Sequence, residues 1–291
     1  MPRYIHQRPD WPQFRWDSEP LLPLVSRIRH RQGQLLGRLE AVGLALRDIT
    51  TLEALTEEIT QSADIEGEVL AANQVRSSLA RRLGMDKGGL VPSSRDVDGM
   101  VDVLLDTTQH FQSPITEERL KGWQAALFPS GRSGMYKITV GEWRSDATGP
   151  MQVVSGPMNR ERVHFEAPAA NLIPNEIIPF LEWIEADQGL DPVLKAGVAH
   201  LWLLTIHPFE DGNGRISRAL TECMLARADG ASQRFYSLSS QIRLDRKGYY
   251  EMLENTQKGD LDITRWLLWF LQCLNRALDH AEEIVAKVWH R

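Results

Sequence analysis

The sequence is poor in cysteine and has no long apolar run. Only two cysteines, Cys223 and Cys273, occur among 291 residues, and each lies in an apolar stretch with helical spacing. Two cysteines exclude a disulfide framework and a four-cysteine zinc site, and they are typical of a reducing compartment. No segment contains 18 consecutive apolar residues, and the first residues lack the apolar core of a secretory signal. These absences predict a cytoplasmic protein that does not enter a membrane.

The chain also lacks an excess of basic residues. It has 33 Lys and Arg against 39 Asp and Glu, which gives a formal net charge of −6. This balance argues against a protein that coats nucleic acid, although a local basic pocket for phosphate groups remains compatible with it. Hydrophobic residues make up 42% and charged residues 25% of the chain. Such a composition is ordinary for a soluble globular protein with a substantial core.

Helical periodicity dominates the chain and predicts a mainly α protein with one small β-hairpin. The segment 1–17 contains three tryptophan or phenylalanine residues interrupted by prolines, so we expect an extended segment that docks onto the body. Gly, Pro and Ser residues in 86–95 divide an N-terminal helical region, 1–90, from the rest, 96–291. The predicted helices are 21–47, 52–66, 73–83, two within 96–128, 174–186, 191–206, 214–229, 245–258 and 262–288.

The most specific string runs from His207 to Arg218 and reads HPFEDGNGRISR. The apolar helix before it is predicted to end at His207, because Pro208 does not continue a helix well. Residues 212–214, Gly-Asn-Gly, are three consecutive residues able to adopt positive φ, so the turn can direct backbone N–H groups at an anion. The next helix begins near its last glycine, and a helix N-terminus attracts phosphate.

The side chains of this string supply the chemistry of phosphoryl or nucleotidyl transfer. Arg215 and Arg218 are three residues apart, so they share a helix face and can bind phosphate oxygens bidentately. Asp211 places a carboxylate beside the turn, suited to Mg²⁺. His207 lies four residues earlier and can take a proton from an incoming nucleophile. A zinc site built from His200, His207 and Asp211 is a weaker alternative, because no known helical zinc spacing occurs.

The string resembles the signature of Fic-domain proteins, His-x-Phe-x-(Asp/Glu)-Gly-Asn-Gly-Arg-x-x-Arg, and matches every specified position. The resemblance implies a Fic-fold helical bundle that transfers AMP from ATP to a Ser, Thr or Tyr hydroxyl of a protein. It implies that His207 deprotonates this hydroxyl, that Asp211 holds Mg²⁺ and that Phe209 fixes the loop in the core. The residues that it implies for phosphate binding are Gly212, Asn213, Gly214, Arg215 and Arg218.

A second segment, SADIEG from Ser62 to Gly67, resembles the inhibitory motif (Ser/Thr)-x-x-x-Glu-(Gly/Asn) of the same family. The resemblance implies that Glu66 pairs with Arg218 and spoils the γ-phosphate site. A carboxylate at this arginine would neutralise the cation that ATP needs and repel the incoming phosphate. Taken alone, the six-residue pattern also fits an ordinary helix end at Gly67.

Two further segments resemble parts of Fic proteins that contact the substrates. The predicted hairpin at about 150–166 resembles the flap that holds a target segment by strand addition, although a purely structural hairpin remains an alternative. Its target-binding residues are expected to be Val153, Val154, Ser155 and Gly156. Tyr249, Tyr250 and Gln257 resemble positions on the adenine and ribose side. Adjacent tyrosines cannot both face one pocket, so at most one is expected to lie in the core.

The resemblance covers about residues 50–275, and the first 45 residues resemble a region that accompanies some bacterial Fic proteins. The sequence therefore predicts an AMP transferase that uses ATP and Mg²⁺ and is inhibited by its own N-terminal helix. A protein substrate on the flap is expected, self-modification and a homodimer are compatible, and no nucleic acid or membrane is expected. Alternatives are a Fic protein with another donor such as UTP or CDP-choline, an enzyme that removes AMP, and a non-catalytic nucleotide-binding module. An intact His207 argues against the last.

Overall fold

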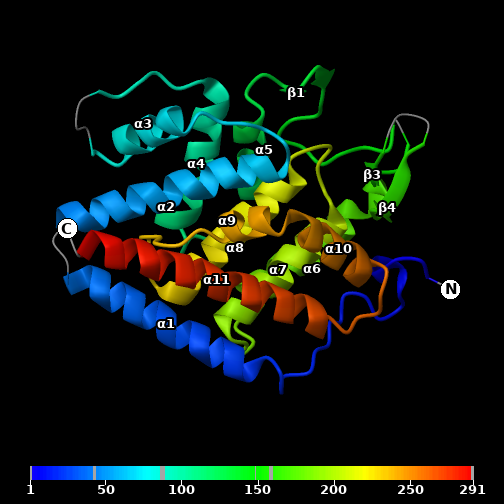
Figure 1. The fold of residues 1–291 in the computed structure, drawn as a ribbon. Helices are drawn as coiled ribbons and strands as arrows, with labels where there is room; N and C mark the ends of the chain where they lie inside the picture. The colour runs from blue at the N-terminus through cyan, green and yellow to red at the C-terminus, as the bar shows by residue number, and fades with distance from the viewer. Residues whose placement is uncertain (1, 42–43, 86–88, 148, 157–159, 290–291) are drawn as a thin grey trace.

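The fold is mainly α, as the sequence predicts (Figure 1). The computed structural model describes residues 2–41, 44–85, 89–147, 149–156 and 160–289. The helices are α1 (Leu22–Ala41), α2 (Leu44–Ile65), α3 (Ala72–Arg82), α4 (Arg95–Gln109), α5 (Glu117–Leu127), α6 (Ile173–Glu185), α7 (Pro192–Ile206), α8 (Asn213–Asp229), α9 (Leu238–Leu244), α10 (Arg246–Gln257) and α11 (Thr264–Trp289). Short 3-10 turns lie at Ile5–Gln7 and Ala170–Leu172. In the described part of the chain, no helix is both long and apolar enough to cross a membrane.

The helix pair α7 and α8 lies at the centre of the molecule (Figure 1). Almost every residue of α7 is buried, which explains why its sequence is apolar on all faces rather than on one stripe. The long helix α11 crosses α7 closely, and the Trp266 indole N–H donates to the Gly197 carbonyl at 2.8 Å. A side chain at Gly197 would collide with the Phe270 ring, because a Cβ there would lie 2.9 Å from it. This close crossing fixes the first half of α7, the helix that leads into the motif loop.

The N-terminal region packs onto the same core as the motif helices. Its first residues dock through aromatic rings, with Trp11 and Phe14 edge-on to Trp202 of α7, so the docking expected for residues 1–17 is confirmed. Helix α1 lies along α11, and α2 lies against α9 and α3 (Figure 1). The polar end of α2 thereby reaches the N-terminal end of α8.

Two antiparallel two-stranded ribbons complete the fold. The predicted hairpin is present as β3 (Gln152–Ser155) and β4 (Arg162–Glu166), with a register irregularity between Val153 and Val154. Residues 157–159 of the predicted flap lie outside the described part of the chain. A smaller ribbon, β1 (Arg132–Ser133) with β2 (Tyr136–Lys137), was not predicted, because two-residue strands carry no periodic pattern.

Besides this small ribbon, the predicted elements differ from the observed ones at two places. The first predicted helix, 21–47, was too long, because α1 ends at Ala41 and residues 44–47 already belong to α2. Residues 42–43 of that prediction, and residues 86–88 of the predicted connection, lie outside the described residues. Helix α9 was missed, because a seven-residue helix is too short to show a clear period.

Candidate active site

His207 closes α7 in an unusual backbone conformation. Its φ of 51° and ψ of 58° are left-handed, and it is the only non-glycine residue with positive φ in the described ranges. Such a conformation costs free energy for a residue with a Cβ, and strained residues of this kind concentrate at functional sites. The following Pro208 prevents the helix from continuing, so the backbone turns and directs the imidazole out of the helix line.

The hydrogen bonds of His207 define which ring nitrogen can act as a base. Its Nδ1 lies 3.2 Å from the carbonyl oxygen of Leu204, which only accepts hydrogen bonds, so Nδ1 carries the proton and Nε2 carries the lone pair. Burial lowers the pKa of His207 to about 4, and the nearby Arg144 guanidinium adds to this effect. The imidazole is therefore neutral at pH 7 with Nε2 available to accept a proton.

We expect the His207 imidazole to titrate near pH 4 in an NMR titration of the histidine ring protons. The pKa is lowered because folding buries the ring, so the folded protein binds a proton there more weakly than the unfolded chain, whose histidines titrate near 6.5. This histidine therefore stabilises the fold fully above about pH 6.5, and the contribution is lost as the pH falls toward 4. A His207 resonance that titrates near pH 6.5 would contradict the neutral, buried base.

The loop after His207 is held by its own side chains. Phe209 is fully buried and packs on Trp143, as expected. Asn213 clamps Phe209, because its Oδ1 accepts from the Phe209 N–H at 3.0 Å and its Nδ2 donates to the Phe209 carbonyl at 2.8 Å. The Asn213 side chain is thus committed to the loop, and only its backbone is left for an anion.

Within residues 212–214 only Gly212 has a positive φ, 88°. The three consecutive residues with positive φ that the sequence allows are therefore not present. Gly212 is the N-cap of α8, and Gly214 already belongs to the helix. A side chain at Gly212 would also clash with the Phe128 ring, 2.9 Å from a Cβ. The anion site is therefore a helix N-terminus rather than an extended nest of N–H groups.

Arg218 meets the predicted inhibitory motif at the end of α2. Its Nη2 donates to Glu66 Oε1 at 2.7 Å and to the Ser62 carbonyl, and its Nε donates to Ser62 Oγ at 2.9 Å. The guanidinium is 2% exposed, and its Nη1 has no hydrogen-bond partner among the described residues. Ser62, Glu66 and Arg218 are thus brought together as the sequence predicts. The free Nη1 is a buried donor that an anion could satisfy.

The Glu66 carboxylate lies against the N-terminal end of α8. A Cβ added at Gly214 would collide with it, and the same Cβ would be 3.2 Å from Arg218 Nη1. A helix N-terminus beside a buried guanidinium favours a negatively charged group. The Glu66 carboxylate therefore fills a position whose electrostatics favour an anion, and a glycine at 214 makes room for it.

A second carboxylate, Glu68, was missed by the sequence analysis. Its Oε2 accepts a hydrogen bond from Arg215 Nη1 at 2.6 Å. Arg215 is otherwise buried, stacks over the Phe128 ring at 4.8 Å and leaves its Nε without a partner among the described residues. The signal was weak, because the six-residue motif ends at Gly67 and an acidic residue just after a helix is common. Both motif arginines are therefore paired with carboxylates from the segment that follows α2.

Three carboxylates, those of Glu66, Glu68 and Asp211, lie near one another at this site. Burial raises the pKa of Glu68 above its usual range, Arg215 opposes this, and the charges of Asp211 and Glu66 raise it further. Three carboxylates thus stand near two guanidiniums, an arrangement that repels an incoming triphosphate. The same two guanidiniums without Glu66 and Glu68 would attract it.

Asp211 is the one predicted metal ligand. It accepts hydrogen bonds from Ser133 of β1 and from the Gly212 N–H, and it is partly exposed. The described residues contain no group of three or more His, Cys, Asp or Glu side chains that could hold a metal alone. A Mg²⁺ ion at Asp211 would therefore need phosphate oxygens and water as its other ligands, which is how this ion usually binds in nucleotide-dependent enzymes. The donor set fits such an ion, but not a structural zinc.

The zinc alternative is further weakened by His200. Its two ring nitrogens lie 2.8 Å from Thr221 Oγ1 and from the Tyr249 hydroxyl, and burial lowers its pKa to about 3. These bonds use both nitrogens of a fully enclosed ring. His200 is therefore a structural residue that joins α7, α8 and α10.

The predicted adenine-side residues separate into two groups. Tyr249 is buried and bonded to His200, so it is the core member of the tyrosine pair, as expected of one of them. Tyr250 is 37% exposed, and its hydroxyl lies 3.5 Å from Glu66 Oε2. Gln257 is buried and contacts Thr205 near the end of α7 at 3.3 Å. Only Tyr250 of these three has both an exposed surface and a direct contact with the Glu66 carboxylate.

Arg144 is a second residue that the sequence analysis missed. It is 3% exposed, and its Nε donates to the His207 carbonyl at 2.7 Å while its backbone N–H donates to the Pro208 carbonyl. Its Nη2 donates to the Pro168 carbonyl, two residues beyond β4. Arg144 therefore connects the motif loop to the base of the hairpin. No local pattern marks it, because a buried arginine in a loop has no characteristic spacing.

The hairpin presents its predicted flap residues at the surface. Val153 is half-buried against Tyr4 and Phe165, whereas Val154 and Ser155 are exposed, and Gly156 has a φ of 104°. Ser155 Oγ lies 2.5 Å from His164 Nε2 across the ribbon. In the described part of the chain no hydrogen bond joins these residues to the motif side chains, and Arg144 joins the base of the hairpin, at Pro168, to His207.

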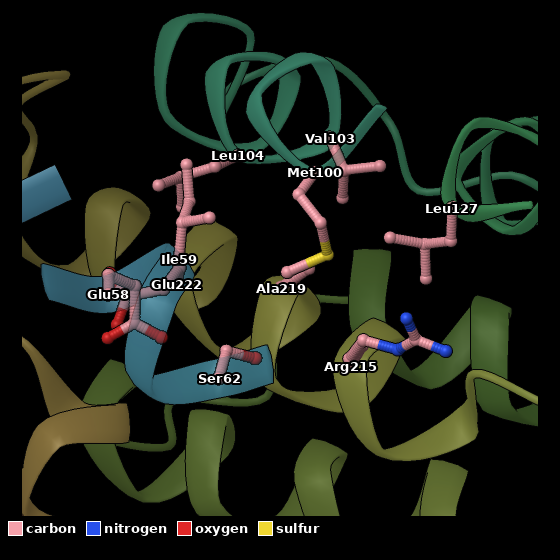
Figure 2. A pocket seen from close by; sticks show the side chains of 10 residues that line it. All are labelled: Glu58, Ile59, Ser62, Met100, Val103, Leu104, Leu127, Arg215, Ala219 and Glu222. Carbon is pink, nitrogen blue, oxygen red and sulfur yellow. The ribbon is translucent and has the colours of Figure 1, made fainter. Parts of the chain in front are cut away.

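A small cavity lies between α2, α4 and α8 (Figure 2). Ile59 and Ser62 line it from α2, Met100 from α4, and Arg215 and Ala219 from α8. Its volume is about 20 Å³, room for about one water molecule. It is therefore a packing gap between α2 and the helices α4 and α8, and not a nucleotide pocket.

Known proteins are similar to this chain in sequence and in fold. The model of the Fic/DOC family matches residues 114–225, and a domain of unknown function, DUF4172, matches residues 4–85. The Protein adenylyltransferase Fic of Culex quinquefasciatus is 26% identical over 232 residues, which cover 78% of this chain and 41% of the relative. The chain thus spans about two fifths of the length of that relative.

Solved structures show the same fold. A Fic family protein from Desulfovibrio desulfuricans superposes with a TM-score of 0.65 at 21% identity, covering 90% of this chain and 75% of that one. A Fic domain containing signaling protein from Bacteroides thetaiotaomicron gives 0.64 at 22% identity, with coverage of 89% and 95%. The predicted Fic fold is confirmed.

Proposed function

We propose that the chain is a protein adenylyltransferase that moves AMP from ATP to a protein hydroxyl, since residues 114–225 match the model of the Fic/DOC family. The observation that carries the proposal is the pairing of a neutral His207, with a free Nε2, and a helix N-terminus flanked by two buried arginines. One group can accept a proton from a hydroxyl, and the other can bind a polyphosphate. Few sites other than that of a phosphoryl or nucleotidyl transferase need both.

Each residue has one task in the reaction. The N-terminal N–H groups of α8, Arg215 and Arg218 bind the phosphates and orient the α-phosphorus. His207 Nε2 takes the proton of the acceptor hydroxyl, whose oxygen attacks the α-phosphorus while the bond to the leaving pyrophosphate breaks. Asp211 would hold Mg²⁺, which would neutralise charge on the phosphates. Arg144 holds the His207 carbonyl and so preserves the orientation of the base.

The N-terminal helical region, residues 1–90, is proposed to regulate the catalytic part, residues 96–291. Glu66 and Glu68 pair with Arg218 and Arg215, so ATP has to compete with two carboxylates for the cations of its phosphate site. This double pairing supports inhibition more strongly than the motif alone, because it engages both arginines. The proposed activity is therefore low until the end of α2 moves or is altered.

The acceptor side is proposed to be the hairpin β3–β4, which would hold an extended protein segment by strand pairing. Such pairing reads backbone groups, so it is compatible with modification of another protein or of a second copy of this chain. The phosphate-binding residues do not contact the base of the nucleotide and so do not select it. An experiment with different nucleotides therefore has to distinguish ATP from another donor.

The proposal is tested by labelling with ATP that carries the radioactive phosphate either at α or at γ. We expect a Glu66→Gly protein with Mg²⁺ to incorporate the α-label into protein and not the γ-label, because AMP is the transferred group. Protein labelled from γ would instead show a kinase reaction. Protein labelled from neither position, with ATP bound, would contradict AMP transfer and favour another donor or AMP removal.

A further inference from the structure

Glu254 of α10 binds three cationic or polar groups around the hairpin. Its carboxylate accepts from His164 Nδ1 at 2.6 Å and from Arg162 Nη2 at 2.9 Å, both on β4, and from Lys258 Nζ at 2.6 Å. Its side chain is 14% exposed. Burial alone would raise the pKa of Glu254, but the hydrogen bonds from Lys258, His164 and Arg162 outweigh it and lower the pKa to about 2. The group is therefore a permanent anion that holds β4 against α10.

His164 extends the contact of Glu254 with β4 to the other strand of the hairpin, β3. Because Glu254 is ionised, His164 Nδ1 must donate to it, which leaves Nε2 to accept from the Ser155 hydroxyl of β3 at 2.5 Å in the neutral ring. Ser155 lies opposite Arg162 in the strand register. The chain Ser155–His164–Glu254 thus fastens both strands of the hairpin to one helix.

The same helix also contacts the inhibitory segment. Tyr250 lies four residues before Glu254, hence on the same side of α10, and its hydroxyl is within 3.5 Å of Glu66. The base of the hairpin is held separately by Arg144, which also holds the His207 carbonyl. The hairpin is therefore held at two points. One is Glu254 on α10, the helix that also carries Tyr250 beside Glu66, and the other is Arg144, which also bonds to His207.

We propose that Glu254 is a positioning residue that sets the hairpin, and hence the acceptor hydroxyl, at a defined place relative to His207. The inference rests on the proposed function, since the hairpin is the proposed docking strand. Glu254 does not contact the motif residues, so its loss is expected to affect the acceptor and not the nucleotide.

The experiment uses the full chain with Glu66→Gly and adds Glu254→Gln, Glu254→Asp or, as the matched control, Glu251→Gln. Glu251 lies one turn earlier on α10 and is largely exposed, 3.6 Å from Lys247. Hydrogen exchange of the β3 and β4 amides measures how firmly the hairpin is held. Transfer of α-labelled AMP to dephosphorylated casein, an unfolded protein rich in hydroxyls, gives KM for the acceptor and for ATP separately.

We expect Glu254→Gln to raise hairpin exchange and the KM for casein each about tenfold or more, because a neutral amide keeps at most part of the three bonds. KM for ATP and the exchange of α7 and α8 should stay within about twofold, with Glu254→Asp restoring part of the effect and Glu251→Gln having none. Unchanged hairpin exchange in Glu254→Gln would overturn the inference. Equal rises in both KM values, or no recovery with Asp, would show a general structural role and also overturn it.

Absence of casein labelling in the parent Glu66→Gly protein would count against the proposed function. In that case hydrogen exchange still decides whether Glu254 holds the hairpin. The failure of the proposed activity is thus distinguishable from the failure of the positioning role.

Discussion

Replacing His207 by Ala in the Glu66→Gly protein is expected to lower AMP transfer by about 10²–10⁴-fold, the usual contribution of a general base. His207 is the neutral imidazole beside the phosphate-binding helix, and its free Nε2 is positioned by the Nδ1 bond to Leu204. ATP affinity should change little, since the groups proposed to bind phosphate lie on α8 and not on His207. The measurement pairs α-label incorporation with calorimetric ATP binding on the same protein.

The control for this substitution follows from the backbone of His207. Its left-handed conformation, φ 51°, is tolerated better by Asn than by Ala, so His207→Asn removes the base with less strain on the loop. Both variants should be equally inactive and bind ATP alike. An Asn variant with substantial transfer activity would show that the Ala variant failed through loop distortion and that His207 is not the base.

The correctly predicted elements are those whose structure is determined by residues close to one another in the sequence. The apolar repeat of α7 shows the period and length of a buried helix, and Pro208 marks its end. Glycine at 212 and the arginines at 215 and 218 are local as well, so the helix N-terminus of the site followed from the motif. The break between the first two helices was misplaced, because apolar residues recur at helical spacing both before Ala41, where α1 ends, and after Leu44, where α2 begins.

The residues that were missed act through contacts that no local pattern contains. Glu68 and Arg215 are 147 residues apart, Arg144 and His207 are 63 apart, and His164 and Glu254 are 90 apart. Each pair joins a residue of ordinary sequence surroundings to the site only after the chain has folded. A motif recognises the residues around one loop, whereas the groups that restrain that loop come from tertiary packing.

Removing both carboxylates that pair with the motif arginines, Glu66 and Glu68, is expected to raise ATP affinity by more than the product of the two single effects. Glu66→Gly frees Arg218, which is almost fully buried, and the loss of such a charged pairing corresponds to about tenfold or more. Glu68 is 43% exposed, so solvent screens its pairing with Arg215 and its removal is worth only about two- to fivefold on the Glu66→Gly background. With Glu66 present, Glu68→Ala alone should change little, because the γ-phosphate position remains occupied.

The ATP affinity of the double variant is expected to exceed the product of the two single effects for an electrostatic reason. The charge of Glu66 raises the pKa of Glu68, so removing Glu66 lets Glu68 hold its proton less tightly and pair with Arg215 more strongly. Calorimetry with ATP on the four proteins of the double-mutant cycle measures this coupling directly. Glu53→Ala, an exposed carboxylate earlier on α2, controls for net charge. If Glu68→Ala leaves the ATP affinity of the Glu66→Gly protein unchanged, the inhibition depends on Glu66 alone and the Arg215 pairing is only structural.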